Sequence, residues 1–325
     1  MFLPLLRRKL VRAIVLGGSG FLGQRLCRRL VEAGFCVHSV SRSGPPKSEP
    51  EPWWSEMEWT AATLGTDLCS SVLKGADLVF HLVSTTVPST ANHDVVKDIE
   101  SNLIATIRTV EAAASMQVRR IVFLSSGGTV YGVAQQLPIP ETHATEPICA
   151  YGIHKLAIEK YLQLYTRQAR LPSIALRVSN MYGQSQDCSK PVGAIAHFAN
   201  QAVNGGTIEV WGDGSTVRDY VHVDDVAAAL LKAACYEGAE RVFNVGTGRG
   251  ASINELIEMV REGMAEQVRV RYTKGRGYDV PANILDVERA RRELSWAPEI
   301  RLEDGVAEVL RAARMRTRGG SVTLS

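Results

Sequence analysis

The chain has 325 residues, of which 45% are hydrophobic and 22% are charged. This length predicts about two structural units, and this composition is typical of a globular protein, which excludes a disordered, collagen-like or coiled-coil chain. The formal net charge of +3 is too small to indicate a nucleic-acid or membrane surface. No apolar run approaches the roughly 18 residues of a membrane span, so we expect no membrane span.

The N-terminal segment MFLPLLRRKLVR does not fit a secretory signal, because its basic residues follow the apolar stretch rather than precede it. The six cysteines form no CxxC pair, and the seven histidines form no HxxH or HxxxH pair. We therefore expect no metal site, reduced cysteines and a cytoplasmic location.

The first predicted elements form a βαβ unit. Residues 13–16 are a short apolar run bounded by glycines, which predicts a buried parallel strand. Residues 22–33 carry apolar side chains at helical spacing and predict a helix that ends at Gly34. A second strand is expected at 37–40, with a right-handed connection.

The next segment, 43–58, is rich in proline and predicts a long surface loop whose tryptophans, Trp53 and Trp54 with the nearby Trp59, pack on the sheet. Beyond it, strands and helices alternate. Strands are expected at 77–83, 120–126 and 174–180, with helices at about 92–116 and 150–170. This alternation predicts an α/β fold with a doubly wound parallel sheet.

After residue 180 the alternation weakens and glycine-rich turns appear. The segment 223–238 predicts a helix and 241–248 a strand. Two further helices are expected around 286–294 and 303–315.

Three glycines between the first strand and the first helix predict a phosphate-binding turn. Gly17 permits the tight turn, Gly20 lets a pyrophosphate approach the backbone, and Gly23 lets the helix pack on the strand. The free amides and the positive dipole end of the helix then face the phosphates, and Phe21 and Leu22 of its first turn are also expected to contact a dinucleotide. Because the turn lies between two strands of one βαβ unit, it is a strong signal.

The end of the second strand predicts which dinucleotide is bound. An acidic residue there would accept hydrogen bonds from the ribose of NAD, but the strand ends with Ser41, Arg42 and Ser43. Arg42 is expected to pair with a 2′-phosphate, and the two serines to donate to it. We therefore favour NADP slightly over NAD, and we expect Asp67 to contact the adenine.

Tyr151 and Lys155 are four residues apart in a predicted helix, so their side chains share one face. A lysine at about 4 Å would lower the phenol pKa from about 10 by up to about three units. The sequence thus predicts a phenolate that exchanges the proton of a sugar hydroxyl while a nicotinamide takes the hydride.

The order of motifs supports this interpretation. GGSGFLG, VFHLVS, VFLSSGGTVYG, AYGIHK, LRVSNMYG, GDGSTVRDYVHVDDVA and FNVGTG follow one another. Over about residues 12–310 this set resembles the extended short-chain dehydrogenase/reductase family, in particular its NAD-dependent epimerases and dehydratases that act on nucleotide sugars, such as UDP-galactose 4-epimerase. The resemblance implies a Rossmann domain, a smaller nucleotide-sugar domain and frequently a homodimer formed through a four-helix bundle.

The resemblance implies domain boundaries and site residues. The Rossmann domain would span 11–180, with 221–247 returning to it, and the nucleotide-sugar domain would comprise 181–220 and 248–318. Tyr151 and Lys155 match the catalytic pair. Expected cofactor contacts also include Leu82, Val83, Ser84 and Asn102. The residues that match the substrate site are Asn180 and Arg218 for the sugar diphosphate, Arg276 for phosphate and Asp279 for the nucleoside ribose.

Two departures from the family pattern stand near the tyrosine. The catalytic Ser/Thr position falls on Gly127, so we expect Ser126 or Thr129 to supply the hydroxyl if the strand end is bulged. Sugar 4,6-dehydratases carry Asp-Glu where this chain has Gly128 and Thr129. Without those acids the elimination of water has no acid and base, which excludes a dehydratase.

Three functions remain. The leading one, on the resemblance, is an NDP-hexose 4-epimerase. The second is an NADPH-dependent reductase of an NDP-4-keto-6-deoxysugar, which the segment at Arg42 favours. The third is a dinucleotide-binding relative without catalysis, which Gly127 makes conceivable and the intact Tyr–Lys pair opposes.

Overall fold

The structure is a computed structural model that describes residues 11–46, 50–65, 70–168, 170–186, 193–264, 267–275 and 280–320. Three residues expected in the site lie outside the described residues: Asp67, Arg276 and Asp279. None of the helices in the described part of the chain has the length and apolar character that crossing a bilayer requires. The same residues contain no cluster of histidine, cysteine or acidic side chains suited to a metal ion.

The first βαβ unit forms as expected. Strand β1 (Arg12–Leu16) leads into helix α1 (Phe21–Glu32), and strand β2 (Cys36–Ser41) pairs in parallel with β1. Alternate residues of β1 enter two different cores, Val15 on one face of the sheet and Ile14 on the other. Burial on both faces explains why this strand is apolar throughout.

Seven parallel strands make the main sheet, in the order β10-β6-β5-β4-β1-β2-β3. The remaining strands of this sheet are β3 (Met57–Ala61), β4 (Leu78–His81), β5 (Arg120–Ser126), β6 (Ser173–Val178) and β10 (Val242–Val245). The doubly wound parallel sheet is therefore confirmed.

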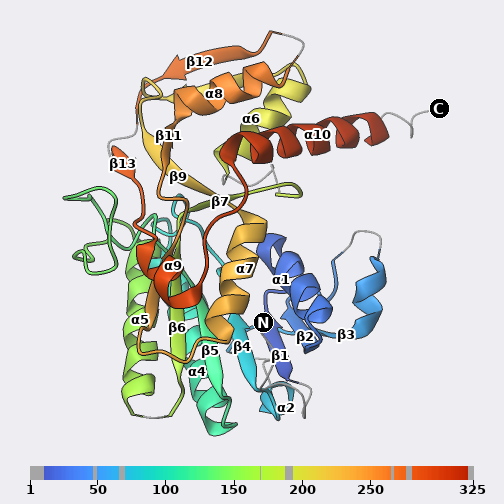
Figure 1. The fold of residues 1–325 in the computed structure, drawn as a ribbon, viewed down its shortest axis with the longest axis vertical. Coiled ribbons are helices and arrows are strands. Elements are labelled where there is room, and N and C mark those ends of the chain that lie inside the picture. Colours follow the sequence, from blue (N-terminus) through green and yellow to red (C-terminus); the bar gives the residue numbers. More distant parts are fainter. Residues whose placement is uncertain are drawn as a thin grey trace.

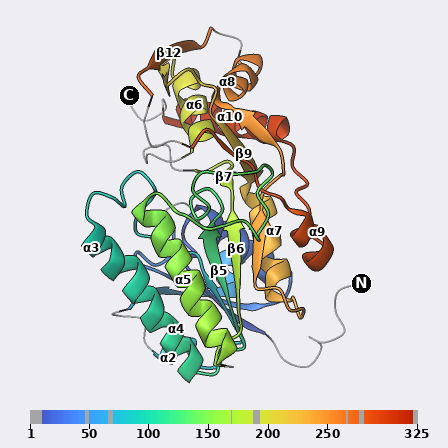
Figure 2. The same ribbon diagram turned by 90° about the vertical axis from the view of Figure 1, so that its left-hand side faces the viewer.

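Helices cover both faces of this sheet (Figures 1 and 2). On one face α1, α7 (Val223–Ala234) and α9 (Glu288–Leu294) close one apolar core. On the other face α4 (Ala105–Ser115) and α5 (Ala150–Arg167) close a second core, together with the short α2 (Ser70–Leu73).

The segment expected as a loop at 43–58 differs from that expectation. A short 3-10 helix covers Pro52–Glu56, and β3 then adds an edge strand that pairs with β2. An edge strand has one partner strand and one half-buried face, so its sequence signal is weak beside a run of prolines. The expected packing of Trp53, Trp54 and Trp59 is confirmed: Trp53 and Trp54 are 9% and 8% exposed, and the partly buried Trp59 packs against the same core.

The helix expected at 92–116 is three consecutive segments. It begins as α3 (Val95–Asp98), continues as the π-helix η2 (Ile99–Ile104) and ends as α4. A π-turn inside a helix shifts the register of the side chains that follow, and such turns are frequent at functional sites.

The second part of the molecule lies above the carboxyl ends of the main strands (Figure 1). Its strands are β7 (Asn180–Tyr182), β8 (Thr207–Trp211), β9 (Val217–His222), β11 (Gly250–Ser252), β12 (Arg269–Thr273) and β13 (Ala282–Asn283). Its helices are α6 (Ala194–Val203), α8 (Ile253–Glu262) and α10 (Leu302–Gly320), which enclose a core of their own. The two parts face each other across the edge where a doubly wound sheet binds its ligands.

Candidate functional site: a dinucleotide turn beside a tyrosine–lysine pair

The glycine turn has the close contacts that a phosphate-binding turn needs. Gly17 has a φ of +91°, which favours glycine. A Cβ on Gly23 would lie 2.1 Å from the Gly17 carbonyl oxygen. At Gly20, the N-cap of α1, a Cβ would meet only that same oxygen within 4 Å, so the space above the backbone is open. The residues present therefore fit a dinucleotide pyrophosphate at the helix N-terminus.

Gly18 is a further member of this turn that the motif analysis did not single out. A Cβ there would lie 2.2 Å from Oγ of Ser39 on β2 and 3.0 Å from Sγ of Cys27 on α1. The doubled glycine in GGSGFLG was the available signal. Gly18 lets the turn pack flat between the first helix and the second strand.

The expected cofactor residues after β4 lie next to the glycine turn. The Leu82 N–H donates to the Leu16 carbonyl at 3.0 Å. A Cβ on Gly17 would lie 3.2 Å from Cγ2 of Val83. Ser84, the next residue, lines a narrow cavity that reaches the catalytic helix.

At the end of β2 the Ser41 hydroxyl is buried and donates to the Gly44 carbonyl at 2.7 Å, so its proton is already used within the turn. Arg42 is exposed, and no ion pair engages it among the described residues. Ser43 is exposed beside it. The expected contacts of Ser41, Arg42 and Ser43 with a 2′-phosphate stay predictions.

The first two turns of α5 bring Tyr151 and Lys155 together. Lys155 is 4% exposed, and its Nζ donates to the Leu124 carbonyl at 2.8 Å. The same Nζ lies 5.5 Å from the ring centroid of Tyr151 and 4.8 Å from that of Phe123. Both members of the pair line the narrow cavity, together with Ser84 and Asn102. Val83, which lies against Gly17 of the glycine turn, lines the same cavity, so the phenol and the amine lie close to that turn.

The expected low pKa of the phenol is wrong for the chain without ligands. Burial raises the pKa of Tyr151 to about 12, although a hydrogen bond with Ser84 lowers it in part. Burial also lowers the pKa of Lys155 to about 8. Desolvation penalises whichever form is charged, so it opposes both the phenolate and the ammonium. Burial is the largest cause of both shifts, and neither group is among the causes of the other's shift.

Of the hydroxyls near Gly127, Ser126 does not take the position of the family serine. The pairing of β5 with β6 runs without interruption from Ile121 to Ser126, so the strand end has no bulge. Ser125 turns towards α5 and donates to Oε1 of Glu159 at 2.5 Å. Because side chains alternate along a strand, Ser126 faces the opposite side of the sheet.

Thr129 lies against the catalytic turn of α5. A Cβ on Gly152, the residue after Tyr151, would lie 2.6 Å from the Thr129 carbonyl oxygen. Oγ1 of Thr129 is buried and has no hydrogen-bond partner among the described residues. A buried hydroxyl without a partner is costly, so Thr129 is the better placed of the two candidates to meet a ligand.

Gly127 itself has no room for a side chain. A Cβ there would lie 2.5 Å from Cδ1 of Leu285 and 3.0 Å from the Arg177 carbonyl oxygen. Asn283, two residues before Leu285, donates to the Gly127 carbonyl at 3.1 Å. The segment that contains Leu285 thus occupies the space that a serine would need.

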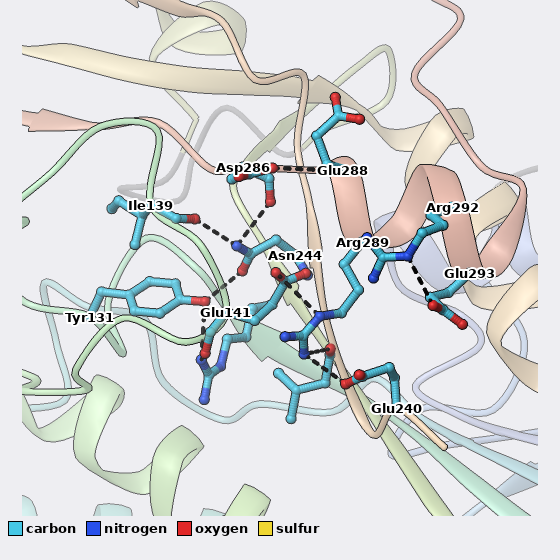
Figure 3. A network of polar contacts seen from close by, with 12 residues as sticks. Tyr131, Ile139, Glu141, Glu240, Asn244, Asp286, Glu288, Arg289, Arg292 and Glu293 are labelled. Atoms are coloured by element: carbon cyan, nitrogen blue, oxygen red, sulfur yellow. Dashed lines mark hydrogen bonds and ion pairs between the residues drawn. The ribbon is translucent and has the colours of Figure 1, made fainter. Parts of the chain in front are cut away.

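A polar network fixes the loop that follows β5 (Figure 3). The Tyr131 hydroxyl donates to Oδ1 of Asn244 at 2.7 Å. Nδ2 of Asn244 donates to the carbonyls of Ile139 and Asp286 at 2.8 and 3.1 Å. On the same network, Glu141 accepts from the Asn244 N–H and lies 3.6 Å from Nε of Arg289. The loop carrying Thr129 is thereby tied to β10 and α9.

Of the residues expected to bind the sugar nucleotide, the structure describes Arg218 and Asn180. Nη1 of Arg218, on β9, donates to the carbonyl of Val280 at 2.8 Å, across 62 positions of sequence. Asn180, on the adjacent strand β7, donates to the Asp219 carbonyl at 3.3 Å. The expected diphosphate residues that the structure describes thus lie on neighbouring strands.

The sequence analysis missed His154, which lines the cavity, and Asp98, which contacts His154. His154 lies on α5 between Tyr151 and Lys155 and lines the cavity with them. Asp98 pairs with it from the end of α3. The signal for His154 was its place inside the motif YGIHK, and the signal for Asp98 was its spacing of four from Asn102.

Comparison with known proteins agrees with this geometry. The model of the NAD dependent epimerase/dehydratase family matches residues 13–246, and the chain belongs to this family. A dTDP-4-dehydro-6-deoxyglucose reductase of Escherichia coli is 29% identical over 309 residues, which make up 93% of this chain and 98% of that protein.

Two solved structures of UDP-glucose 4-epimerases are also similar. That of Thermotoga maritima, with UDP-glucose, has a TM-score of 0.84 and 30% identity and covers 95% of this chain and 99% of its own. That of Thermus thermophilus, with NAD, has a TM-score of 0.84 and 28% identity and covers 94% and 99%. The homologues are NAD-dependent sugar-nucleotide epimerases or reductases, which confirms the expected family.

Proposed function

We propose that this chain is a nucleotide-sugar 4-epimerase that moves a hydride reversibly at C4 of an NDP-hexose. The observation that carries the proposal is the placement of Tyr151 and Lys155 in one cavity at the inner end of the dinucleotide turn. The turn, the pair and the second part of the molecule meet at one edge of the sheet. A cofactor on the turn and a sugar held from above would both reach the phenol.

Bound NAD supplies the acceptor for the C4 hydride. Tyr151 takes the proton of the C4 hydroxyl as the C4–H bond breaks, and it returns that proton to the C4 oxygen when the hydride comes back to the other face of the ketose. The Lys155 ammonium beside the phenol favours the phenolate. Thr129 supplies the second hydroxyl to the C4 oxygen.

The test is interconversion of UDP-glucose and UDP-galactose by the purified protein, with Tyr151→Phe as the variant. Turnover should fall by roughly 10²–10⁴, because the ring stays while the proton carrier is lost. Tyr161→Phe, on the exposed side of the same helix, is the matched control and should keep wild-type turnover. Near-wild-type turnover in Tyr151→Phe would rule out the mechanism.

The second candidate is an NADPH-dependent NDP-4-keto-6-deoxysugar reductase. Arg42 at the end of β2, without a carboxylate beside it, favours this candidate, and so does a phenol whose pKa of about 12 keeps it a proton donor. A protein purified with bound nicotinamide would favour the epimerase. Empty protein that consumes added NADPH with a 4-keto sugar nucleotide would favour the reductase. If the protein turns over neither substrate, the remaining interpretation is a dinucleotide-binding relative that has no catalytic activity.

The preference for NADP also belongs to this proposal. If Arg42 pairs with a 2′-phosphate, Arg42→Ala should weaken NADP by about 1.5–3 kcal/mol and leave NAD almost unchanged. Arg28→Ala is a matched control, because Arg28 is an exposed arginine of α1 whose partner is Glu32. Calorimetric titration with both dinucleotides measures the difference. An equal loss for both cofactors, or a wild type that prefers NAD, would contradict it.

For the sugar nucleotide we propose that Asn180, Arg218 and Arg276 hold the diphosphate and that Asp279 holds the nucleoside ribose. Arginine suits phosphate because of its planar fork of donors. UDP should then raise the melting temperature, as any ligand selective for the folded state must. Replacing both arginines by alanine should remove that shift and keep the one caused by the dinucleotide.

We further propose the domain division at 11–180 with 221–247 against 181–220 with 248–318, and a homodimer. Support for the dimer comes from the α4–α5 face, the name used here for six exposed apolar side chains on α5 and on the helical segments that lead into α4: Val95 and Val96 of α3, Ile104 of η2, and Ile153, Tyr161 and Leu164 of α5. Figure 2 shows α3, α4 and α5 side by side as an outer layer. Two such faces packed together would form a four-helix bundle.

A further inference from the structure

A buried contact between a histidine and a carboxylate joins α5 to the segment before the π-turn. Nδ1 of His154 contacts Oδ2 of Asp98, and the two side chains are 6% and 1% exposed. His154 lies three residues after Tyr151, so it shares the helix face of that residue. A pair buried to this degree costs stability unless further hydrogen bonds satisfy it. The other partners of Asp98 therefore indicate what the pair does.

The second oxygen of Asp98 holds two segments that face α5. Oδ1 accepts hydrogen bonds from Oγ1 of Thr86 at 2.5 Å and from Nδ2 of Asn102 at 2.6 Å. Asn102, within the π-helix η2, accepts the N–H of Thr85 through its own Oδ1 at 2.8 Å. Asp98 thus links three parts of the site: α5, η2 and the loop that follows β4.

Two buried carboxylates, Glu159 and Asp98, act on Lys155. Glu159, one turn further along α5, binds Arg177 of β6 with Oε2 2.7 Å from Nη2. Asp98 has the imidazole of His154 as its neighbour. Removing one partner of such a pair leaves an uncompensated charge in a site of low dielectric.

The charge of Asp98 acts on both members of the catalytic pair. Burial is the largest cause of both pKa shifts. The negative charge of Asp98 favours the ammonium and disfavours the phenolate, so its own contribution to the pKa is upward for both Lys155 and Tyr151. The other titratable groups that face the pair are Glu159 of the same helix, Cys149 before it and His81 of β4. His81 is neutral, because burial and the nearby Lys155 lower its pKa to about 3.

We propose that His154 is a positioning residue for Tyr151: through the contact of its Nδ1 with Oδ2 of Asp98 it fixes Asn102 and the loop 84–87 beside the phenol and offsets the carboxylate charge there. The inference rests on the proposed function for its effect on turnover. Its effect on the loop belongs to the ligand-free protein and needs no substrate.

Three variants separate the parts of this inference. His154→Leu removes the donor, and His154→Asn keeps an N–H donor near the position of Nδ1. Asp98→Asn removes the charge and keeps acceptors and donors. We expect His154→Leu to move the acid limb of the pH profile of turnover up by about one pH unit, and Asp98→Asn to move it down. His154→Asn should restore most of the wild-type profile.

The second readout is amide exchange of Thr85 in the ligand-free protein, followed by NMR. Without the contact between residue 154 and Asp98, the amide of Thr85 should exchange about tenfold faster in His154→Leu, which is the fold-change for one hydrogen bond. The acceleration should be smaller in His154→Asn. The matched control is His38→Asn, because His38 is also buried and lies 3.1 Å from a carboxylate, Glu58, on β3. It should change neither readout.

The inference is overturned if His154→Leu leaves both readouts unchanged, or if His38→Asn changes them equally. Shifts of the same sign in His154→Leu and Asp98→Asn also overturn it. If Thr85 exchanges faster in His154→Leu alone while no sugar nucleotide is turned over, the positioning role is supported and the proposed function fails. If sugar nucleotide is turned over but His154→Leu changes neither the pH profile nor the amide exchange of Thr85, the proposed function is supported and the positioning role fails.

Discussion

At the scale of single residues, burial shifts the pKa values of Lys155 and Tyr151 in the directions that disfavour their charged forms. Burial lowers the pKa of Lys155 from 10.5 to about 8 and raises that of Tyr151 from 10.0 to about 12. Between pH 8 and 10.5 the unfolded chain therefore holds a lysine proton that the folded chain has released. In this window stability rises with pH, because the unfolded state binds more protons.

Lys155→Met removes this dependence and keeps the volume of the side chain. Between pH 8 and 10.5, the unfolding free energy of the wild type should rise by roughly 3 kcal/mol relative to that of the variant. Each unit of pKa shift corresponds to about 1.36 kcal/mol. Urea unfolding at a series of pH values measures it. Lys160→Met, an exposed position on the same helix, should follow the wild type. A difference between wild type and Lys155→Met that does not vary with pH would contradict the shifted lysine.

The space beside Gly127 is too small to hold both a side chain at position 127 and the side chain of Leu285. Gly127→Ser puts a Cβ 2.5 Å from Cδ1 of Leu285 and should destabilise the fold by about 1–3 kcal/mol through overpacking. Combined with Leu285→Ala, the cost should be smaller than the sum of the two single changes, because the new side chain fills the space left by Leu285. Equilibrium unfolding of the four proteins gives the coupling.

Gly128→Ser serves as the neighbouring control. A Cβ there has Ser126 Oγ at 4.0 Å as its nearest neighbour, which is ordinary contact. We expect a change within about 0.5 kcal/mol. Additive effects of Gly127→Ser and Leu285→Ala would show that Leu285 is not the reason for the glycine.

At the scale of elements, Asn244 of β10 fastens the loop after β5 to the segment before α9 (Figure 3). Asn244→Leu would leave the carbonyls of Ile139 and Asp286 buried without this donor, and the Tyr131 hydroxyl without its acceptor. The Ile139 carbonyl keeps the Asp286 N–H as a donor, so two groups lose their partner, and at about 1–3 kcal/mol for each a loss of about 2–5 kcal/mol is expected.

Tyr131→Phe gives the graded comparison for Asn244→Leu. It removes one donor and keeps both carbonyl contacts of Asn244, so it should cost less, about 1–2 kcal/mol. Both values come from urea unfolding. Equal costs for the two variants would show that the bonds of Asn244 to the loop and to the segment before α9 carry no stability.

At the scale of the whole molecule, the α4–α5 face decides the proposed oligomeric state. Tyr161 and Leu164 are 42% and 45% exposed on α5. The double variant Tyr161→Glu/Leu164→Glu should be a folded monomer, because charges buried in a helix bundle are costly. Light scattering after size-exclusion chromatography measures the mass. Met315→Glu, on the exposed side of α10, should leave a dimer intact. A monomeric wild type would contradict the proposal.

Much of the fold was predictable because its signals are local. The apolar run of β1, the glycine turn and the amphipathic helix α1 each follow from a few consecutive residues, and all three form as expected. Edge strand β3 and the π-turn were missed. The first depends on pairing with β2 across a proline-rich segment, and the second on the hydrogen bonds of Asn102 and Asp98 with the loop after β4.

The sequence by itself determined the doubly wound sheet, the dinucleotide turn and the helix face shared by Tyr151 and Lys155. Spacing along one element fixes these features, since helix and strand periods do not depend on the rest of the chain. Only the tertiary structure decided the surroundings of that pair. The contact of Asp98 with His154 and that of Gly127 with Leu285 join residues far apart in sequence. Burial, which shifts the pKa values of Tyr151 and Lys155, likewise exists only once distant segments pack together.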